Sequence, residues 1–499
     1  MAASAPCWAG MHACWTSIDW TIPGVVLAVL AIVVSRVGVR GVGLALLRTY
    51  QTIGHALLRA RGLTPDTAAE RRVVSGAAWA EFCDTLKAAG ATCLAPGLGT
   101  PADPFNQAEG YRYLARIARA GLENFLEGAS AEAPTLTCIV DGNRAAPIKL
   151  GSDNPDNLYF NATIAGRYAY RVHGTRGTVN YLGFGTQAGQ YGQPGGLQTV
   201  AYLEGADMTV NSDGTFDIVL SPERPADLPA RANWLRTATE PDLGLLIVRQ
   251  TFLDRARETP AAVHIERWPE AGNTVPRPLT CAQLEHALQS TGLLVAGASL
   301  MFAQWANAFQ RHTNALPMFS PAVCRAKGGD PNIVYYHSYW RVAPGECLVV
   351  AVRRPPECPH WNFQVNNHWM ESLDYRYHPV HVNKASALYG SGGSIVIVLA
   401  HARPACANAP STAPGYVKRG GEGDEGEELL APTWVSTVGH ECGTMCFRWV
   451  RPKGFATDGS APRPPNPAAH VVRVADLKAF LGDGANELFA EPGHTICSP

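Results

Sequence analysis

Ionisable residues are scarce in this sequence of 499 residues. Asp, Glu, Lys and Arg make up 17% of the chain, against roughly 25% in an average soluble protein. The 41 Lys and Arg nearly balance the 42 Asp and Glu. A protein that binds duplex nucleic acid needs an excess or a dense patch of positive charge. The sequence therefore predicts no nucleic-acid partner.

Diagnostic chemical motifs are also lacking. The 13 cysteines form no CxxC pair, which argues against a disulfide framework or a structural zinc site. No P-loop, GxSxG or HExxH motif is present. The glycine-rich stretch from Gly183 to Gly189 has the wrong spacing for a dinucleotide-binding loop. The cofactor, if there is one, therefore stays unknown, and no residue is assigned to a metal.

A long apolar run is present near the N-terminus, from Ile22 to Val34. It is slightly shorter than the ~20 residues that span a bilayer, but it extends to Leu47 if Arg36 and Arg40 snorkel to the interface. Arginines follow the run, which places the body on the cytoplasmic side by the positive-inside rule. The sequence predicts a single-pass membrane anchor. A cleaved signal or transit peptide and a buried core helix are the alternatives.

The rest of the chain alternates between helical and β-rich stretches. Helical periodicity precedes residue 136 and returns at Thr280, where Thr280 and Gln283 fit a capping box. Short β-rich runs, separated by Gly, Asn, Asp and Pro, fill the other two stretches. We predict a mainly β, α+β fold with two tandem β-sandwich-like units joined by a helical segment and preceded by a membrane helix. The predicted segments are an anchor (1–50), a helical region (51–135), the first β unit (136–275), a helical connector (276–330), the second β unit (331–455, with a flexible insertion at 402–432) and a C-terminal tail with a short helix (456–499).

The two β-rich stretches match each other in order along the chain. Each match is weak alone, but four in the same order predict an internal duplication. Two related units in contact would form a cleft, which is a common place for a ligand. The matches are Pro155–Phe160 with Pro331–Tyr336, Asp213–Leu220 with Gly392–Leu399, Asn233–Leu235 with Thr433–Val435, and Arg249 with Arg448.

Three motifs in the first β-rich stretch resemble a known family. They are DGTFDIVLSP (213–222), NWL (233–235) and LIVRQTF, which ends at Phe252. In this respect the chain is similar to the family called domain of unknown function 1214, best over about 150–270 and more loosely over about 330–450. Arg236 stands where that family usually has Pro. The resemblance implies an all-β fold in these regions and implies no chemistry.

The densest group of polar and aromatic residues runs from His360 to His381. Alternation along a strand would place Asn362, Gln364 and Asn366 on one face, opposite Trp361 and Phe363. A row of amides suits a polar ligand or an acid–base cluster, and it suits a structural hydrogen-bond network equally well. A metal site is a weaker alternative, because no diagnostic ligand spacing appears.

Two further features supply charged candidates. Glu371 and Asp374 would share a face if their turn is helical, and they could then divide acid and base roles. Arg448 lies late in an apolar strand, so it needs Glu441, Glu371 or a bound anion as its partner. We predict catalytic roles for His337, Glu371, Asp374 and His440, and ligand binding by Tyr335, Trp361, Asn362, Asn366, Trp369 and Arg448.

Three functions fit these features. The first is a membrane-anchored enzyme that performs acid–base chemistry on an amphipathic or lipid-derived small molecule in the cleft between the β units. The second is a non-catalytic protein that binds a small molecule or carbohydrate, and the third is a structural protein. The expected partners are the membrane and a small-molecule ligand, and the oligomeric state stays unknown. Fold alone does not decide among these functions.

Overall fold

The computed structural model describes residues 62, 64–190, 197–268, 275–325, 329–410, 432–483, 485–490 and 496–498. The predicted membrane anchor lies outside the described residues, and so does most of the predicted insertion at 402–432. In the described part most elements are β-strands, accompanied by a few helices. The predicted α+β class is therefore confirmed.

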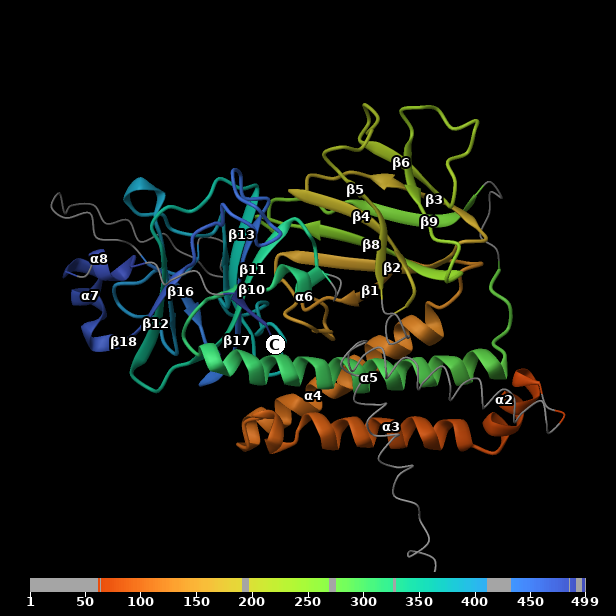
Figure 1. Cartoon of the computed structure of the whole chain (residues 1–499), viewed down its shortest axis with the longest axis horizontal. Helices are drawn as coiled ribbons and strands as arrows, with labels where there is room; N and C mark the ends of the chain where they lie inside the picture. The colour runs from red at the N-terminus through yellow and green to blue at the C-terminus, as the bar shows by residue number, and fades with distance from the viewer. Residues whose placement is uncertain are drawn as a thin grey trace, which may run out of the picture. The chain divides into compact units, whose positions relative to one another are not determined.

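Helices come first along the chain and return between the two β-rich stretches. Figure 1 shows α3, α4 and α5 gathered along one side of the β-strands. Within the described residues, α5 with its continuation to His312 is long and apolar enough to cross a membrane. Residues such as Leu294, Phe302 and Trp305 of α5 are nevertheless buried in a core cluster of this protein. The helices are α2 (Pro65–Val74), α3 (Ala77–Cys93), η1 (Pro96–Leu98), α4 (Pro104–Leu122), η2 (Glu123–Glu127), α5 (Cys281–Phe309) and η3 (Gln310–His312).

Local sequence signals explain where α4 and α5 begin. The Asp103 side chain accepts a hydrogen bond from the backbone N–H of Asn106 at 2.9 Å and so caps α4, and Pro104 follows at the first helical position, which proline favours. The capping box predicted at Thr280 and Gln283 is confirmed. Because such caps satisfy the free N–H groups of the first turn, both helices have fixed starting points.

The first β unit consists of two sheets around one core. In order across the first sheet, the strands are β1 (Thr137–Val140), β2 (Asn157–Ala165), β8 (Leu243–Thr251), β4 (Tyr181–Ala188) and β5 (Gln198–Glu204). The second sheet contains β7 (Asn233–Arg236), β6 (Thr215–Ser221), β3 (Ala169–Thr175) and β9 (Ala262–Trp268). Side chains from both sheets, among them Phe184 and Phe216, share one hydrophobic cluster.

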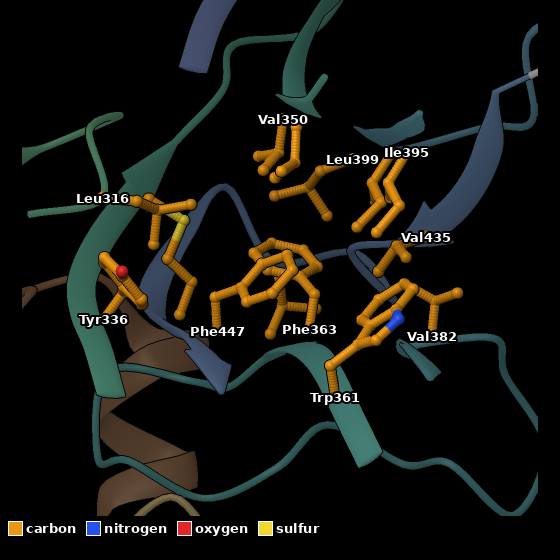
Figure 2. Close-up of a cluster of buried hydrophobic side chains, with 14 of the residues drawn as sticks. Leu316, Tyr336, Val350, Trp361, Phe363, Val382, Ile395, Leu399, Val435 and Phe447 are labelled. Atoms are coloured by element: carbon orange, nitrogen blue, oxygen red, sulfur yellow. The ribbon is translucent and has the colours of Figure 1, made fainter. Parts of the chain in front are cut away.

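The second β unit has the same plan. One sheet has the order β11 (Ile333–Arg341), β17 (Cys442–Val450), β13 (His360–Val365) and β14 (His381–Asn383). The other has the order β16 (Thr433–Ser436), β15 (Ile395–Ala400), β12 (Glu346–Val352) and β18 (Ala468–Arg473). Figure 2 shows the core between them, in which Val350 and Leu399 of one sheet face Phe363 and Phe447 of the other.

Strand order and register are equivalent in the two units. The order β2-β8-β4-β5 corresponds to β11-β17-β13-β14, and β7-β6-β3-β9 corresponds to β16-β15-β12-β18. Each unit has a parallel pair formed by corresponding strands, β6 with β7 and β15 with β16. Tyr159 pairs with Arg249 in the first unit, and Tyr335 pairs with Arg448 at the same point of the second. All four sequence matches therefore fall on equivalent strands.

Short elements complete the second unit. Helices α7 (Leu477–Asp483) and α8 (Ala485–Leu488) pack on the outer face of the sheet that contains β12, where Leu477 and Leu488 join a small core cluster. Near the end of the chain, β19 (Ile496–Cys497) pairs in parallel with β10 (Met318–Phe319). The remaining short helices are α6 (Pro321–Arg325), η4 (Ser391–Gly393) and η5 (Val474–Asp476).

Candidate functional site

A cavity of about 270 Å³ lies between the two β units. Strands β2 and β8 of the first unit and β11 and β17 of the second supply its polar wall, through Arg249, Tyr335 and Arg448 among others. Helix α5 supplies an apolar wall with Phe302 and Trp305. We call this space the central cavity. It lies where the sequence predicts a ligand cleft, and it contains the predicted site residues His337, Tyr335 and Arg448.

Arg448 is a buried cation with neutral partners. Only 5% of its surface is exposed. Its Nη1 donates to the side-chain oxygens of Gln364 and Asn362, and its Nη2 donates to the carbonyl oxygen of Ser152 at 2.6 Å. The predicted partner Glu371 binds Arg116 instead, and the described hydrogen bonds of Arg448 include no carboxylate. Burial opposes the charge of Arg448, but Cys446, neighbouring tyrosines and Asp153 outweigh burial and raise its pKa.

Arg249 occupies the equivalent position of the first unit and has different surroundings. Burial opposes its charge, but Asp330 and neighbouring tyrosines outweigh burial and raise its pKa. The two glutamates that follow Arg249 most closely in the sequence have other partners: Glu258 accepts hydrogen bonds from the backbone N–H groups of Leu253 and Asp254, and Glu266 pairs with Arg171. Each of the two arginines in the central cavity therefore has a carboxylate near it, Asp330 for Arg249 and Asp153 for Arg448.

His337 lines the central cavity as a neutral ring. It stacks between Phe309 and Tyr335, with ring centroids 5.6 and 5.7 Å away. Burial, together with the charge of Arg448, lowers the pKa of His337 to about 3. A general base works best when its pKa is near the working pH. The predicted catalytic role of His337 is therefore not supported by its surroundings, whereas a role in shaping the cavity is.

The predicted row of amides binds a loop of the protein itself. Asn362 donates to the Asn154 side chain at 2.7 Å, Gln364 donates to the carbonyl oxygen of Asp153 at 2.8 Å, and Asn366 donates to the Ser152 hydroxyl at 3.0 Å. All three amides are fully buried. Of the alternatives, this geometry favours the structural hydrogen-bond network, and ligand binding by Asn362 and Asn366 stays a prediction.

Both predicted tryptophans are also structural. Trp361 is buried in the core between the two sheets of the second unit (Figure 2), where its ring stacks on Phe447. Trp369 is 1% exposed, and its indole N–H donates to the carbonyl oxygen of Asn106 on α4 at 3.0 Å. Helix α4 approaches Trp369 closely because Gly110 has no side chain; a Cβ there would lie 2.6 Å from the indole ring. Neither tryptophan is among the residues that line the central cavity.

The other three predicted catalytic residues line a second cavity, of about 210 Å³. It lies between one face of α4 and the second β unit, and we call it the α4 cavity. Glu371 and Asp374 enter it from an extended segment, not from a helical turn. His440 enters from the turn before β17. The four predicted acid–base residues are thus divided between two cavities.

Glu371 and Asp374 have opposite electrostatic surroundings. Glu371 is fully buried, which raises the pKa of its carboxyl group even though Arg116 lies 2.7 Å away and opposes the effect. The hydrogen bond from Arg376 lowers the pKa of Asp374. Burial lowers the pKa of His440 to about 4, so its ring is neutral at pH 7. Like His337, His440 is a poor base at neutral pH.

Several residues that complete these cavities have no recognisable signal in the sequence. Lys149 is buried and donates from Nζ to the carbonyl oxygens of Ser372 and Leu373, at 2.6 and 2.8 Å. Asp153 accepts hydrogen bonds from the backbone and hydroxyl of the same Ser372, at 2.9 and 2.7 Å. Among the described residues, no group of three or more His, Cys, Asp or Glu side chains is placed to hold a metal ion.

Comparison with known proteins identifies a relative of known structure. An uncharacterized protein from Burkholderia cenocepacia is 39% identical over 81% of this chain and 99% of its own length, with a TM-score of 0.69. A protein from Vibrio parahaemolyticus is 11% identical over 72% of this chain and 98% of its own, and its TM-score of 0.39 is too low to support an argument. No family model and no curated protein matches the chain. The resemblance to domain of unknown function 1214 therefore stays a prediction.

Proposed function

This chain belongs to the same family as the uncharacterized Burkholderia cenocepacia protein, and we propose that it binds a small amphipathic monoanion in the central cavity. The observation that carries the proposal is Arg448, a buried cation with neutral partners at the cavity wall. None of its described hydrogen bonds uses Nε–H. A carboxylate accepting from that group would form a charge-assisted hydrogen bond and balance the buried charge.

The opposite wall supports an apolar body for the ligand. Met301, Phe302 and Trp305 of α5 line the cavity, and the rings of Phe302 and Trp305 meet edge to face at 5.8 Å. Transfer of an alkyl chain from water to this wall is favourable in proportion to the apolar area that it buries. At about 270 Å³, the cavity is slightly smaller than the ~300 Å³ lower bound of typical ligand sites. A short-chain carboxylate has the required size and polarity.

The balance of charge favours one negative group on the ligand. Arg249 and Arg448 supply two positive charges, and Asp330, at the same wall, supplies one negative charge. Asp153 also lines the cavity, and its negative charge acts on the buried cation Lys149 as well as on Arg448, so Lys149 balances this second carboxylate. A second anionic group would have to approach Asp330, where like charges repel. A monoanion is therefore the best electrostatic match.

The positions of the predicted catalytic residues fit a ligand-binding protein better than they fit an enzyme. The enzyme suggested by the sequence needs His337 in one site with Glu371, Asp374 and His440, but these residues line two separate cavities. In the central cavity His337 is neutral, with a pKa of about 3. The proposal therefore keeps the amphipathic ligand and the cleft between the units, and it replaces acid–base chemistry with recognition.

Octanoate and octanol provide the test. In isothermal titration calorimetry with the full chain, octanoate is expected to bind roughly 10 to 100 times more tightly than octanol, because a hydrogen bond to a charged group contributes about 1.5–3 kcal/mol. Arg448→Gln should remove this preference, whereas the exposed Arg311→Gln should keep it. Equal affinity of the two ligands for the unmodified protein would refute the proposal.

A second variant covers the case in which Arg448→Gln fails to fold. Met301 lies at the apolar wall, so Met301→Trp fills the cavity and leaves Arg448 in place. This variant should fold, as judged by circular dichroism, and should lose binding of octanoate. Retained binding by a folded Met301→Trp variant would place the ligand elsewhere.

We further propose that the N-terminal apolar run anchors the protein in a membrane, with its body on the cytoplasmic side. The support is the run from Ile22 to Val34 and the arginines that follow it. The full chain should stay in the membrane pellet after carbonate extraction, and a variant without residues 1–50 should be released. Release of the full chain by carbonate or high salt would exclude a spanning helix.

The equivalent strand order also supports an origin by duplication. Both units repeat one order of strands in each of two sheets, and each places an arginine opposite a tyrosine at the same register. We propose that the ancestor was a dimer of one such unit, in which two identical arginines bound the ligand. In the present chain the surroundings of the two arginines have diverged, since Asp330 acts on Arg249 whereas Cys446 and Asp153 act on Arg448.

A further inference from the structure

The α4 cavity is a polar space with balanced charge. Three cationic side chains line it, those of Arg112, Arg116 and Lys149, and so do three carboxylates, those of Glu109, Glu371 and Asp374. Each carboxylate is paired: Glu109 with Arg112, Glu371 with Arg116, and Asp374 with Arg376. The remaining cation, Lys149, has Asp153 near it as a balancing charge. A charged ligand would leave one charge without compensation, which is unfavourable in a partly buried site. The wall is thus matched to a neutral ligand.

Both the cationic groups and the carboxylates that line the α4 cavity have unused hydrogen-bonding capacity. An ammonium group has three N–H donors, and Lys149 uses two of them in described hydrogen bonds although its side chain is buried. A carboxylate accepts about four hydrogen bonds, and Glu371 receives one at each oxygen, from Arg116 and Asn367. A hydroxyl group both donates and accepts. Ligand hydroxyls can therefore use donors and acceptors of the same wall.

An exposed aromatic ring lies at the edge of this polar space. Phe105 lines the α4 cavity and is 46% exposed. Its ring packs against that of His440, with centroids 4.6 Å apart, and the cap of α4 at Asp103 fixes its position. An apolar ring beside ionised groups suits a ligand that has both a C–H face and hydroxyl groups. A sugar ring has this combination.

We propose that the α4 cavity is a second binding site, separate from the central cavity, for a neutral polyhydroxylated ligand of about one sugar ring. The C–H face of the ligand packs on Phe105. Its hydroxyls accept from Lys149 and Arg112 and donate to the carboxylates of Glu109 and Asp374. The proposal does not depend on the ligand of the central cavity, because the two spaces have different linings.

Saturation-transfer NMR with the full chain tests the proposal. The neutral probes are methyl glucoside, methyl galactoside, xylose and inositol, and the charged probes are glucuronate and glucosamine. At least one neutral probe should bind, and at least about 10-fold more tightly than either charged sugar, which corresponds to about 1.4 kcal/mol. Binding of none of the neutral probes, or equal binding of the charged sugars, would overturn the proposal.

Two variants locate the site. Phe105→Ala should weaken binding of the neutral probe about 5-fold or more, whereas Tyr111→Ala should not, since Tyr111 is 64% exposed on the same helix and is not among the residues that line the cavity. Glu109→Gln gives the cavity one excess positive charge and should shift the preference toward glucuronate. An unchanged order of affinities in Glu109→Gln, or equal effects of Phe105→Ala and Tyr111→Ala, would place the sugar elsewhere.

Discussion

Lowering the pH from 7 to 5.5 should reduce the free energy of unfolding by about 4 kcal/mol. Burial lowers the pKa of His337 to about 3 and the pKa values of His368 and His440 to about 4. In the unfolded chain the pKa of histidine is roughly 6.5. As the pH falls below that value, the unfolded chain takes up protons that the folded protein does not, and each histidine then lowers stability by about 1.4 kcal/mol per pH unit.

Acidification destabilises the protein because burial lowers the pKa values of these histidines in the folded state. Because the folded-state pKa values are depressed, the stabilisation is fully present above about pH 6.5 and is lost as the pH falls toward the folded values. Glu371 acts in the opposite sense, since burial raises its pKa and the folded protein gains a proton first. It is a single group, so it offsets only part of the loss.

Urea unfolding curves at pH 7, 6.5, 6, 5.5 and 5 measure the effect. His440→Gln should lower the steepness of the loss by about one third, while His264→Gln, at an exposed position, should not change it. A free energy of unfolding that stays constant down to pH 5 would show that the three histidines take up protons in the folded protein.

Asp156→Asn is expected to destabilise the protein by about 3–5 kcal/mol at pH 7, as does removal of one member of a buried ionic group. Asp156 is 3% exposed. It precedes β2 of the first unit, and its carboxylate lies 3.4 Å from His360 and 3.1 Å from His381 of the second. Asn383 donates to the same carboxylate at 2.9 Å. The substitution keeps the shape and removes the charge that these three partners surround.

The pH dependence separates this effect from a general defect. Burial alone would raise the pKa of Asp156, but His381 and His360 lower it far below its usual range. Its stabilisation is therefore complete above pH ~4, the value for an unfolded Asp, and falls by about 1.4 kcal/mol per pH unit below it. The difference in free energy of unfolding between the parent protein and Asp156→Asn should therefore become smaller as the pH falls below that value. Asp227→Asn, at an exposed position, should leave the free energy of unfolding unchanged throughout.

The strand pattern could be predicted from sequence because it depends on local alternation. Asn362, Gln364 and Asn366 share a face, as period-two alternation requires. The same alternation puts Trp361 on the opposite face, so its burial in the core follows from the rule that predicted the amide row. The prediction that Trp361 binds a ligand gave its aromatic character more weight than its position in the strand.

The partners of these residues could not be predicted, because they come from distant segments. Nothing near Glu371 in the sequence indicates that Arg116 of α4 will be its ion-pair partner. The extended path that brings Glu371 and Asp374 to one cavity follows Met370, whose φ of 56° is unusual for a residue other than glycine. The predicted duplication located the central cavity, but it gave no information on the α4 cavity, because one wall of that cavity is α4, which lies outside the repeated part.

The loop at residues 152–154, which contacts the row of amides in and just after β13, also affects the order of folding. Its three amide contacts join residues that are 208 to 214 positions apart in the chain. Contacts of such long range form slowly, because a long loop must close before they contribute. During synthesis the first β unit is made before β13. The loop at residues 152–154 therefore cannot form its contacts with the amide row until the second unit has been made. Arg448, which donates to Ser152 of that loop, therefore acquires its final surroundings only after nearly the whole chain has been made.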